Sequence, residues 1–145
     1  MPTPDIASNK ATVERLCAAA NTGDLALISA LVDEIAAPDL RMSTPLPGAA
    51  TGPDRLKHVW ATLFRAFPDL RLSVQDLIGE GDKVVVRNVV RGTHRGDYLG
   101  LPGSGTVVTY DEIFIFRFTD GRISEISGVV DLAAQLRQLG LLSAV

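Results

Sequence analysis

The pattern of apolar positions divides the chain into a helical first half and a strand-forming second half. From Val13 to Phe67, apolar residues recur every three or four positions, which is the spacing of amphipathic helices. From Leu70 to Val130 they alternate with polar residues or form short runs, which is typical of strands. The change of period falls at Pro68. The pattern therefore predicts helices first and a run of antiparallel strands afterwards.

Three helices are predicted in the first half. The first follows residues 1–7, which we expect to be a loose tail, and Ser8 is its predicted N-cap. The second is capped by Asp24 and ends at Pro38. The third begins near Pro53, because proline is favoured in the first turn of a helix.

The second half predicts a curved sheet and a short final helix. The expected strands are 70–75, 83–94, 106–118 and 123–130, and residues 40–43 are a further candidate. Asp120-Gly121 gives the last two strands a hairpin turn. Helices followed by antiparallel strands predict an α+β fold, with the helices packed on one face of a strongly curved sheet. Such a sheet wraps into a cone that encloses one apolar pocket.

Length, charge and cysteine content narrow the class of protein. The chain has 145 residues, so we expect a single domain over residues 1–145. Its net charge of −3 gives no basic field for nucleic acid. The single cysteine, Cys17, excludes an internal disulfide and lies on an apolar helical stripe, which favours a buried structural thiol. No zinc-ligand spacing, signal peptide or membrane span is found, so we expect a cytoplasmic protein without a metal.

Five motifs, in their order and spacing, resemble one family. They are FPDL at 67–70, EGDKVVVR at 80–87, RGTHRGDYLGLP at 91–102, FRFTDGRISE at 116–125 and VVDLAAQLRQLG at 129–140. Together they resemble the SnoaL-like polyketide cyclases of the nuclear transport factor 2-like superfamily, over Val13 to Leu142. The resemblance implies a cone of three helices on a curved antiparallel sheet. It also implies a homodimer or a higher homo-oligomer.

The resemblance implies a chemistry as well. The namesake enzymes close the last ring of anthracycline-type aromatic polyketides by an intramolecular aldol reaction, without metal or organic cofactor. The family's acid–base aspartate corresponds to Asp131, and the histidine of its GTH motif corresponds to His94. Many members carry Glu-His-Trp where this chain has Glu125-Ile126-Ser127. Other members help to hydroxylate polyketides, and some have no known activity.

The residues themselves leave two interpretations of Asp131. It shares one face of the last predicted strand with Ser127 and Val129, and if that face lines the pocket, desolvation would make Asp131 a better base. Alternatively, Asp131 caps the helix that begins at Leu132. His94 ends the long strand, where it would assist the reaction through a hydrogen bond or only satisfy a polar position.

Further pocket candidates come from the predicted core and from one loop. Trp60, Phe64 and Met42 are core residues whose side chains we expect in the pocket wall. Tyr98, in the glycine-rich loop 95–105, is a candidate lid residue. Arg87 either stabilises an oxyanion in the pocket or pairs with an acid on the outer face of the sheet.

The sequence thus predicts a cofactor-free enzyme for a hydrophobic carbonyl compound, with no nucleic-acid or membrane partner. One alternative is water addition or epoxide opening on the same scaffold. Another is a non-catalytic binding or dimerisation module, because fold does not fix function. The runs 84–90 and 113–118 hold more apolar residues than one inner face needs. We therefore expect the outer face of the sheet to be buried in a homodimer.

Overall fold

The computed structural model describes residues 4–44 and 46–143 of the chain, which form four helices and five strands within those ranges. In chain order they are α1 (Ile6–Ala20), α2 (Leu25–Ile35), β1 (Ala36–Met42), α3 (Gly52–Ala66), β2 (Arg71–Glu80), β3 (Lys83–Thr93), β4 (Val107–Thr119), β5 (Arg122–Val130) and α4 (Leu132–Gln138). The predicted order of helices and strands is confirmed.

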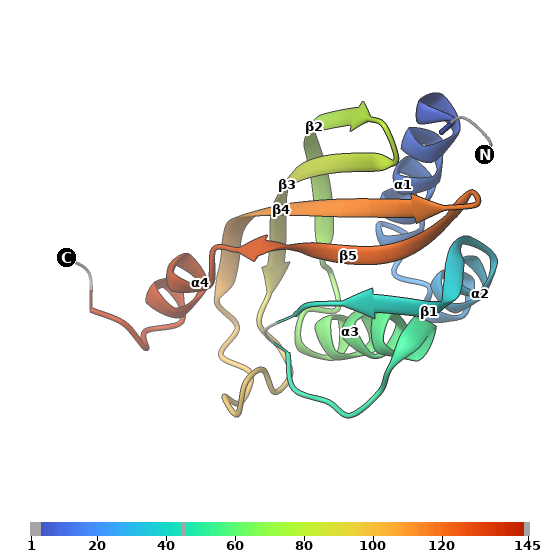
Figure 1. Cartoon of the computed structure of the whole chain (residues 1–145). Helices are drawn as coiled ribbons and strands as arrows, with labels where there is room; N and C mark the ends of the chain where they lie inside the picture. The colour runs from blue at the N-terminus through green and yellow to red at the C-terminus, as the bar shows by residue number, and fades with distance from the viewer. Residues whose placement is uncertain (1–3, 45, 144–145) are drawn as a thin grey trace.

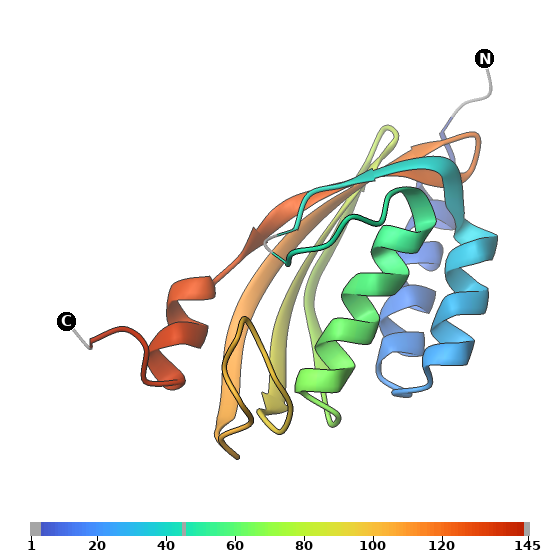
Figure 2. The ribbon, with the colours of Figure 1, turned by 90° about the horizontal axis from the view of Figure 1, so that it is seen from below.

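The five strands form one curved sheet with the order β1-β5-β4-β3-β2. Figure 2 shows α1, α2 and α3 together on one side of this sheet, while α4 lies beyond the end of β5. The pairs β2–β3, β3–β4 and β4–β5 are antiparallel, as predicted. The α+β class is therefore confirmed, and the sheet curves around the side that the helices cover.

β1 departs from the predicted antiparallel pattern, because it pairs with β5 in parallel and makes the sheet mixed. Its register shifts between the pairs Ala36–Ile123 and Arg41–Glu125. The strand begins directly after α2, so the second helix ends at Ile35 and not at Pro38. Pro38 is tolerated inside β1 because β1 is an edge strand.

The predicted N-cap residue is correct for α2 and wrong for α1. Asp24 caps α2 through bonds that its Oδ1 accepts from the backbone N–H groups of Ala26 and Leu27, as predicted. The first helix is capped by Asp5, and Ser8 donates its backbone N–H to Asp5 Oδ1 at 3.0 Å. The cap therefore lies three positions earlier than the predicted Ser8, the helix begins at Ile6, and the predicted tail is shorter; residues 1–3 lie outside the described residues.

The two faces of the sheet differ in burial. Alternate residues of β3, namely Val84, Val86 and Val90, are buried against the helices. The residues between them point to the outer face, where Ile113 on β4 and Val129 on β5 are 41% and 69% exposed. None of the helices in the described parts of the chain is long and apolar enough to cross a membrane.

Candidate functional site

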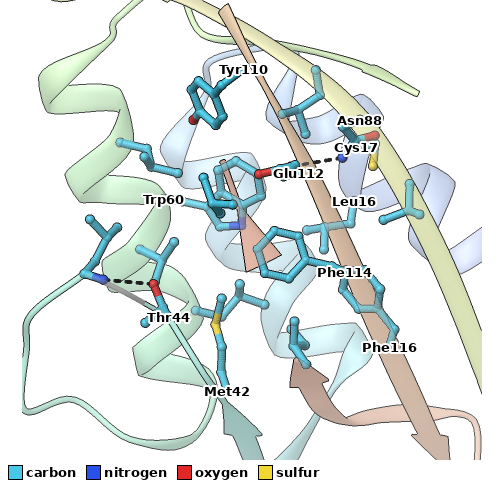
Figure 3. A pocket seen from close by; sticks show the side chains of 18 of the residues that line it. Leu16, Cys17, Met42, Thr44, Trp60, Asn88, Tyr110, Glu112, Phe114 and Phe116 are labelled. Atoms are coloured by element: carbon cyan, nitrogen blue, oxygen red, sulfur yellow. Dashed lines mark hydrogen bonds between the residues drawn. The ribbon is translucent and has the colours of Figure 1, made fainter. Parts of the chain in front are cut away.

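A cavity lies between the helices and the inner face of the sheet, and Figure 3 shows most of its wall. Its volume is about 80 Å³, several times the space that one buried water needs. The wall is mostly apolar: it consists of Leu16, Cys17, Met42, Thr44, Leu46, Leu56, Val59, Trp60, Leu63, Leu72, Val86, Asn88, Tyr98, Tyr110, Glu112, Phe114, Phe116, Ile126, Val130 and Gln135. An apolar cavity with a few polar groups is typical of small-molecule sites.

Glu112 is the one carboxyl group in this wall among the described residues. It lies on β4 between Tyr110 and Phe114, and successive even-numbered residues of the strand point into the cavity. Asn88, directly opposite on β3, donates its Nδ2 to Glu112 Oε1 at 3.0 Å. The dashed line between the two side chains in Figure 3 marks this bond.

Burial sets the charge state of Glu112 and its neighbours. Desolvation raises the pKa of the Glu112 carboxyl above 4.5, and the hydrogen bond from Asn88 opposes part of that rise. Burial, reinforced by the charge of Glu112, raises the pKa of the Cys17 thiol to about 11. Burial likewise raises the pKa of Tyr110 well above its usual value, again with Glu112 contributing. Cys17 and Tyr110 are therefore neutral near pH 7, and the thiol is buried as predicted.

Tyr98 joins the glycine-rich loop to the final helix at one end of the cavity. It is 3% exposed and donates its hydroxyl to Gln135 Oε1 at 2.8 Å. Gln135, on α4, is 1% exposed. Both residues line the cavity, so the loop and α4 close it together through a buried hydrogen bond.

Two of the three aromatic and methionine candidates lie in the cavity wall. Trp60 on α3 and Met42 at the end of β1 line it, where the sequence analysis expected them. Phe64, one helical turn after Trp60, is outside the lining and stacks on the indole ring at a centroid distance of 6.1 Å. The packing by Phe64 fixes the plane of the indole ring.

Asp131 lies at the exit of β5, outside the cavity wall. It is exposed, and its Oδ1 accepts the backbone N–H of Ala134 at 3.0 Å as the N-cap of α4. The preceding residue, Val130, lines the cavity, so in the alternating strand the next side chain points away from it. Ser127, Val129 and Asp131 thus share the outer face of the sheet. The prediction of Asp131 as a base required this face to line the pocket, and it does not.

The other polar candidates also lie outside the cavity wall. His94 is 1% exposed, its Nδ1 is 2.9 Å from Ser104 Oγ, and its ring packs against Phe67. Arg87 is on the outer face, where its Nε donates to Asp76 Oδ2 at 2.7 Å. This is the cross-strand pairing that was the alternative to an oxyanion role. Ser127 is on the outer face as well, opposite Ile115 in the register of β4 and β5.

Glu112 and Asn88 were not predicted as site residues, although the sequence carries a signal for both. In β4 the residues Tyr110, Phe114 and Phe116 share one parity, and Glu112 has the same parity. In β3, Asn88 has the parity of the buried valines. A polar residue at a core parity within a strand is the signal that would have found both.

The polar groups of the cavity suit proton transfer at an apolar ligand. Within the described residues, no group of three or more His, Cys, Asp or Glu side chains is placed to hold a metal ion. The arrangement offers one carboxyl of raised pKa, one amide that fixes it, and neutral hydroxyl and indole donors. These are the elements of a general acid–base site.

Comparisons with known proteins give a family and several related structures. A family model described as SnoaL-like polyketide cyclase matches residues 10–139. A structure from Jannaschia sp. CCS1, assigned as a SnoaL-like polyketide cyclase, has a TM-score of 0.85 at 27% identity and covers 99% of this chain and 99% of that chain. No curated protein sequence matches the chain.

Two Streptomyces proteins extend this comparison. IdmH from Streptomyces antibioticus, assigned as a polyketide cyclase, is 31% identical with a TM-score of 0.73, covering 91% of this chain and 98% of that chain. AclR from Streptomyces galilaeus, assigned as a hydroxylase, is 28% identical with a TM-score of 0.82, covering 97% and 90%. The predicted nuclear transport factor 2-like cone is confirmed by these likenesses.

Proposed function

The chain belongs to the SnoaL-like polyketide cyclase family, and we propose that it closes a ring in a hydrophobic carbonyl compound by an intramolecular aldol reaction, with Glu112 as general base and acid. The observation that carries this proposal is the position of Glu112: a carboxyl of raised pKa, held by Asn88, in an apolar cavity. The substrate class we infer is an aromatic polyketide or a similar compound, of which one ring or the reacting end enters the cavity.

The proposed reaction needs one proton acceptor that later becomes a donor. The Glu112 carboxylate takes a proton from a carbon next to a carbonyl group, and the electron pair moves onto that carbonyl oxygen as an enolate. The enolate carbon attacks a second carbonyl carbon of the same molecule, which forms the ring bond and leaves an alkoxide. The Glu112 carboxylic acid returns its proton to the alkoxide, so no external reactant is consumed.

The environment of Glu112 supports both halves of this cycle. A raised pKa makes the carboxylate a stronger base than an exposed one and makes the acid available nearer to neutral pH. The Asn88 amide holds one carboxylate oxygen, so the other oxygen is oriented for the substrate. The apolar wall limits the water that would compete for the enolate.

A small diketone tests the proposal without knowledge of the natural substrate. 1-(2-Acetylphenyl)propan-2-one has one benzene ring and closes to a six-membered hydroxyketone by the same reaction type. We expect the protein to speed both deuterium uptake at its α-carbons in D₂O and ring closure, measured by NMR against a protein-free control. Glu112→Gln should reduce both rates roughly 10²–10⁴-fold, which is the usual contribution of a positioned base.

Asp131→Asn is the matched variant, because it removes the other candidate carboxylate while asparagine still caps the helix. We expect it to keep the wild-type rates. The reverse result, with Asp131→Asn inactive and Glu112→Gln active, would make Asp131 the base. Binding of the diketone with no acceleration of either step would favour a non-catalytic binding module.

A homodimer through the outer face of the sheet is the second part of the proposal. We define the outer-face patch as Ile78, Val85, Ile113, Ile115 and Val129. Cross-strand register joins its members: Ile78 lies opposite Val85, Val85 opposite Ile115, and Ile113 opposite Val129. A contiguous exposed apolar patch indicates a contact surface, and an extended sheet face can pack against its own two-fold copy.

The oligomeric state of one charged variant tests the dimer. Val129 is 69% exposed, so Val129→Lys should leave the monomer folded while placing a charge in the interface. Leu27→Lys, on α2 and 47% exposed, is the control away from the patch. We expect sedimentation at micromolar concentration to give dimers for the wild type and the control and monomers for Val129→Lys. A monomeric wild type would contradict the proposed dimer.

A further inference from the structure

The indole N–H of Trp60 is a buried hydrogen-bond donor without a protein partner. Trp60 is 9% exposed, and its Nε1 makes no hydrogen bond to any described residue. Buried donors without a partner are rare in folded proteins, because each forfeits its hydration without compensation. Trp60 lines the cavity, and in Figure 3 its nitrogen lies on the ring edge that looks toward Phe114 and Met42. The unpaired donor therefore belongs to the wall that a ligand would contact.

The chemistry of this donor limits what can satisfy it. An indole N–H donates and cannot accept, so its partner must carry an acceptor such as a carbonyl oxygen. The Thr44 hydroxyl also lines the cavity, where its Oγ1 accepts the backbone N–H of Leu46 at 3.2 Å and makes no hydrogen bond to Trp60 Nε1. Phe114 and Met42 offer no acceptor of ordinary strength. A ligand oxygen is thus the natural partner for Nε1.

Trp60 and Glu112 lie on different walls of the same cavity. Trp60 belongs to α3, which covers the inner face of the sheet, and Glu112 belongs to β4 within that sheet. Stacking on Phe64 holds the indole plane, and Asn88 holds the carboxyl group, so both groups are positioned before a ligand binds. A ketone between the walls can present its α-carbon to one group and its oxygen to the other.

We propose that the Trp60 indole N–H binds the reacting carbonyl oxygen of the substrate and stabilises the negative charge that develops there. This inference rests on the proposed function for the reaction, although the binding contact itself does not. When Glu112 removes the α-proton, the electron pair moves onto the carbonyl oxygen, and a fixed donor stabilises the enolate more than the neutral ketone. The substrate class is accordingly a compact aryl ketone unit with its oxygen directed at α3.

Two isosteric probes separate this hydrogen bond from apolar burial. Acetophenone and α-methylstyrene differ only in having C=O or C=CH₂ on the same ring. Their dissociation constants should be measured by calorimetry for the wild type, Trp60→Phe and Phe114→Leu. Trp60→Phe keeps an aromatic side chain without the N–H, and Phe114→Leu alters the apolar wall while the indole N–H stays in place.

We expect the preference for acetophenone over α-methylstyrene to fall about threefold to tenfold in Trp60→Phe, the usual worth of one neutral hydrogen bond. Phe114→Leu should weaken both probes alike and keep the preference. The ¹³C=O stretch of bound labelled acetophenone should lie at lower frequency in the wild type than in Trp60→Phe. An unchanged preference in Trp60→Phe, or an equal carbonyl frequency in both proteins, would overturn the proposal.

The same experiment in the Glu112→Gln background separates this inference from the proposed function. If Glu112 is not the base, the binding preference still reports on Trp60. If Trp60 is not the donor, Trp60→Phe leaves the preference for acetophenone over α-methylstyrene unchanged. Glu112→Gln still loses deuterium uptake at the α-carbons of the diketone. The two proposals therefore fail independently.

Discussion

Two carboxyl groups, one within the sheet and one directly after its last strand, have opposite surroundings. Glu112 lies in the middle of β4 on the inner face, pairs in register with Val130 and is half-buried in a cavity wall that contains Tyr110 and Phe114. Asp131 follows Val130 directly and is exposed. One of its carboxylate oxygens accepts a backbone N–H from the first turn of α4. One step along a strand reverses the direction of a side chain, and with it the solvation of a carboxyl group. Parity within the strand, more than nearness to its end, therefore separates a candidate base from a cap.

The sharpest test of this contrast shortens one side chain and lengthens the other. Glu112→Asp keeps the acid but withdraws it by one methylene, roughly 1.5 Å, and such a misplacement costs on the order of 10²-fold in rate. Asp131→Glu should leave the rate of α-deuterium uptake by the diketone unchanged, since that carboxyl is outside the cavity. Equal losses of this rate in Glu112→Asp and Asp131→Glu would show that the two carboxyl groups do not differ in their role as proposed.

The hydroxyl of Tyr98 connects the cavity with α4, so its removal should affect both regions. Tyr98→Phe leaves the buried Gln135 oxygen without its 2.8 Å donor, at a cost of about 1–3 kcal/mol in the free energy of unfolding. Urea unfolding of the two proteins measures this cost. A stability equal to that of the wild type would mean that Gln135 finds another donor and that the contact does not hold the loop to the helix.

The pH dependence of stability should also distinguish the two carboxyl groups. Because burial raises the pKa of Glu112 above 4.5 in the folded protein, the folded state keeps a proton that the unfolded state has released. Stability contributed by this group is complete below about pH 4.5 and falls as the pH rises through the raised pKa. Glu112→Gln removes that loss, so its free energy of unfolding relative to the wild type should increase as the pH rises above about 4.5. A difference that is flat with pH would contradict the raised pKa.

The smallest expected effects are those at the cap. Asp131→Ala should lose about 1 kcal/mol of stability, because Ala134 N–H loses its acceptor, whereas Asp131→Asn should lose little. Thermal unfolding of both variants beside the wild type gives this comparison. If the asparagine variant were as destabilised as the alanine variant, the charge of Asp131, and not only its hydrogen bond, would support α4.

The regular elements could be predicted because their signals are local. Periodicity located the helices and the four antiparallel strands, and the cap at Asp24 follows from its own neighbours. The parallel pairing of β1 with β5 could not be predicted in this way, since Arg41 and Glu125 are 84 positions apart and nothing local specifies their contact. The start of α1 was misjudged because Asp5 and Ser8 are both good caps by type.

The candidate site was predicted only in part, for a related reason. Trp60, Met42 and Tyr98 are large apolar or amphipathic residues, and burial alone places such residues in a wall. The inward face of β5 was misjudged because the predicted face ran through Ser127 and Asp131, whereas Ile126 and Val130 line the cavity. A register shift between β4 and β5 near Phe118 changes parity after Ile123, and the sequence pattern does not reveal it. His94 as an assisting group stays a prediction.

The pairing of β1 with β5 has a consequence for how the chain folds during synthesis. The ion pair between Arg41 and Glu125 joins residues 84 positions apart, so β1 leaves the ribosome roughly 4 to 17 seconds before its partner at ordinary translation rates. During that interval its edge hydrogen-bonding groups are unpaired and available to other chains. A chain released before Arg122 would keep α1 to α3 but never complete this edge, and it would be prone to aggregate. β1, in the N-terminal third of the chain, therefore gains its pairing partner only when β5, the last strand, has been synthesised.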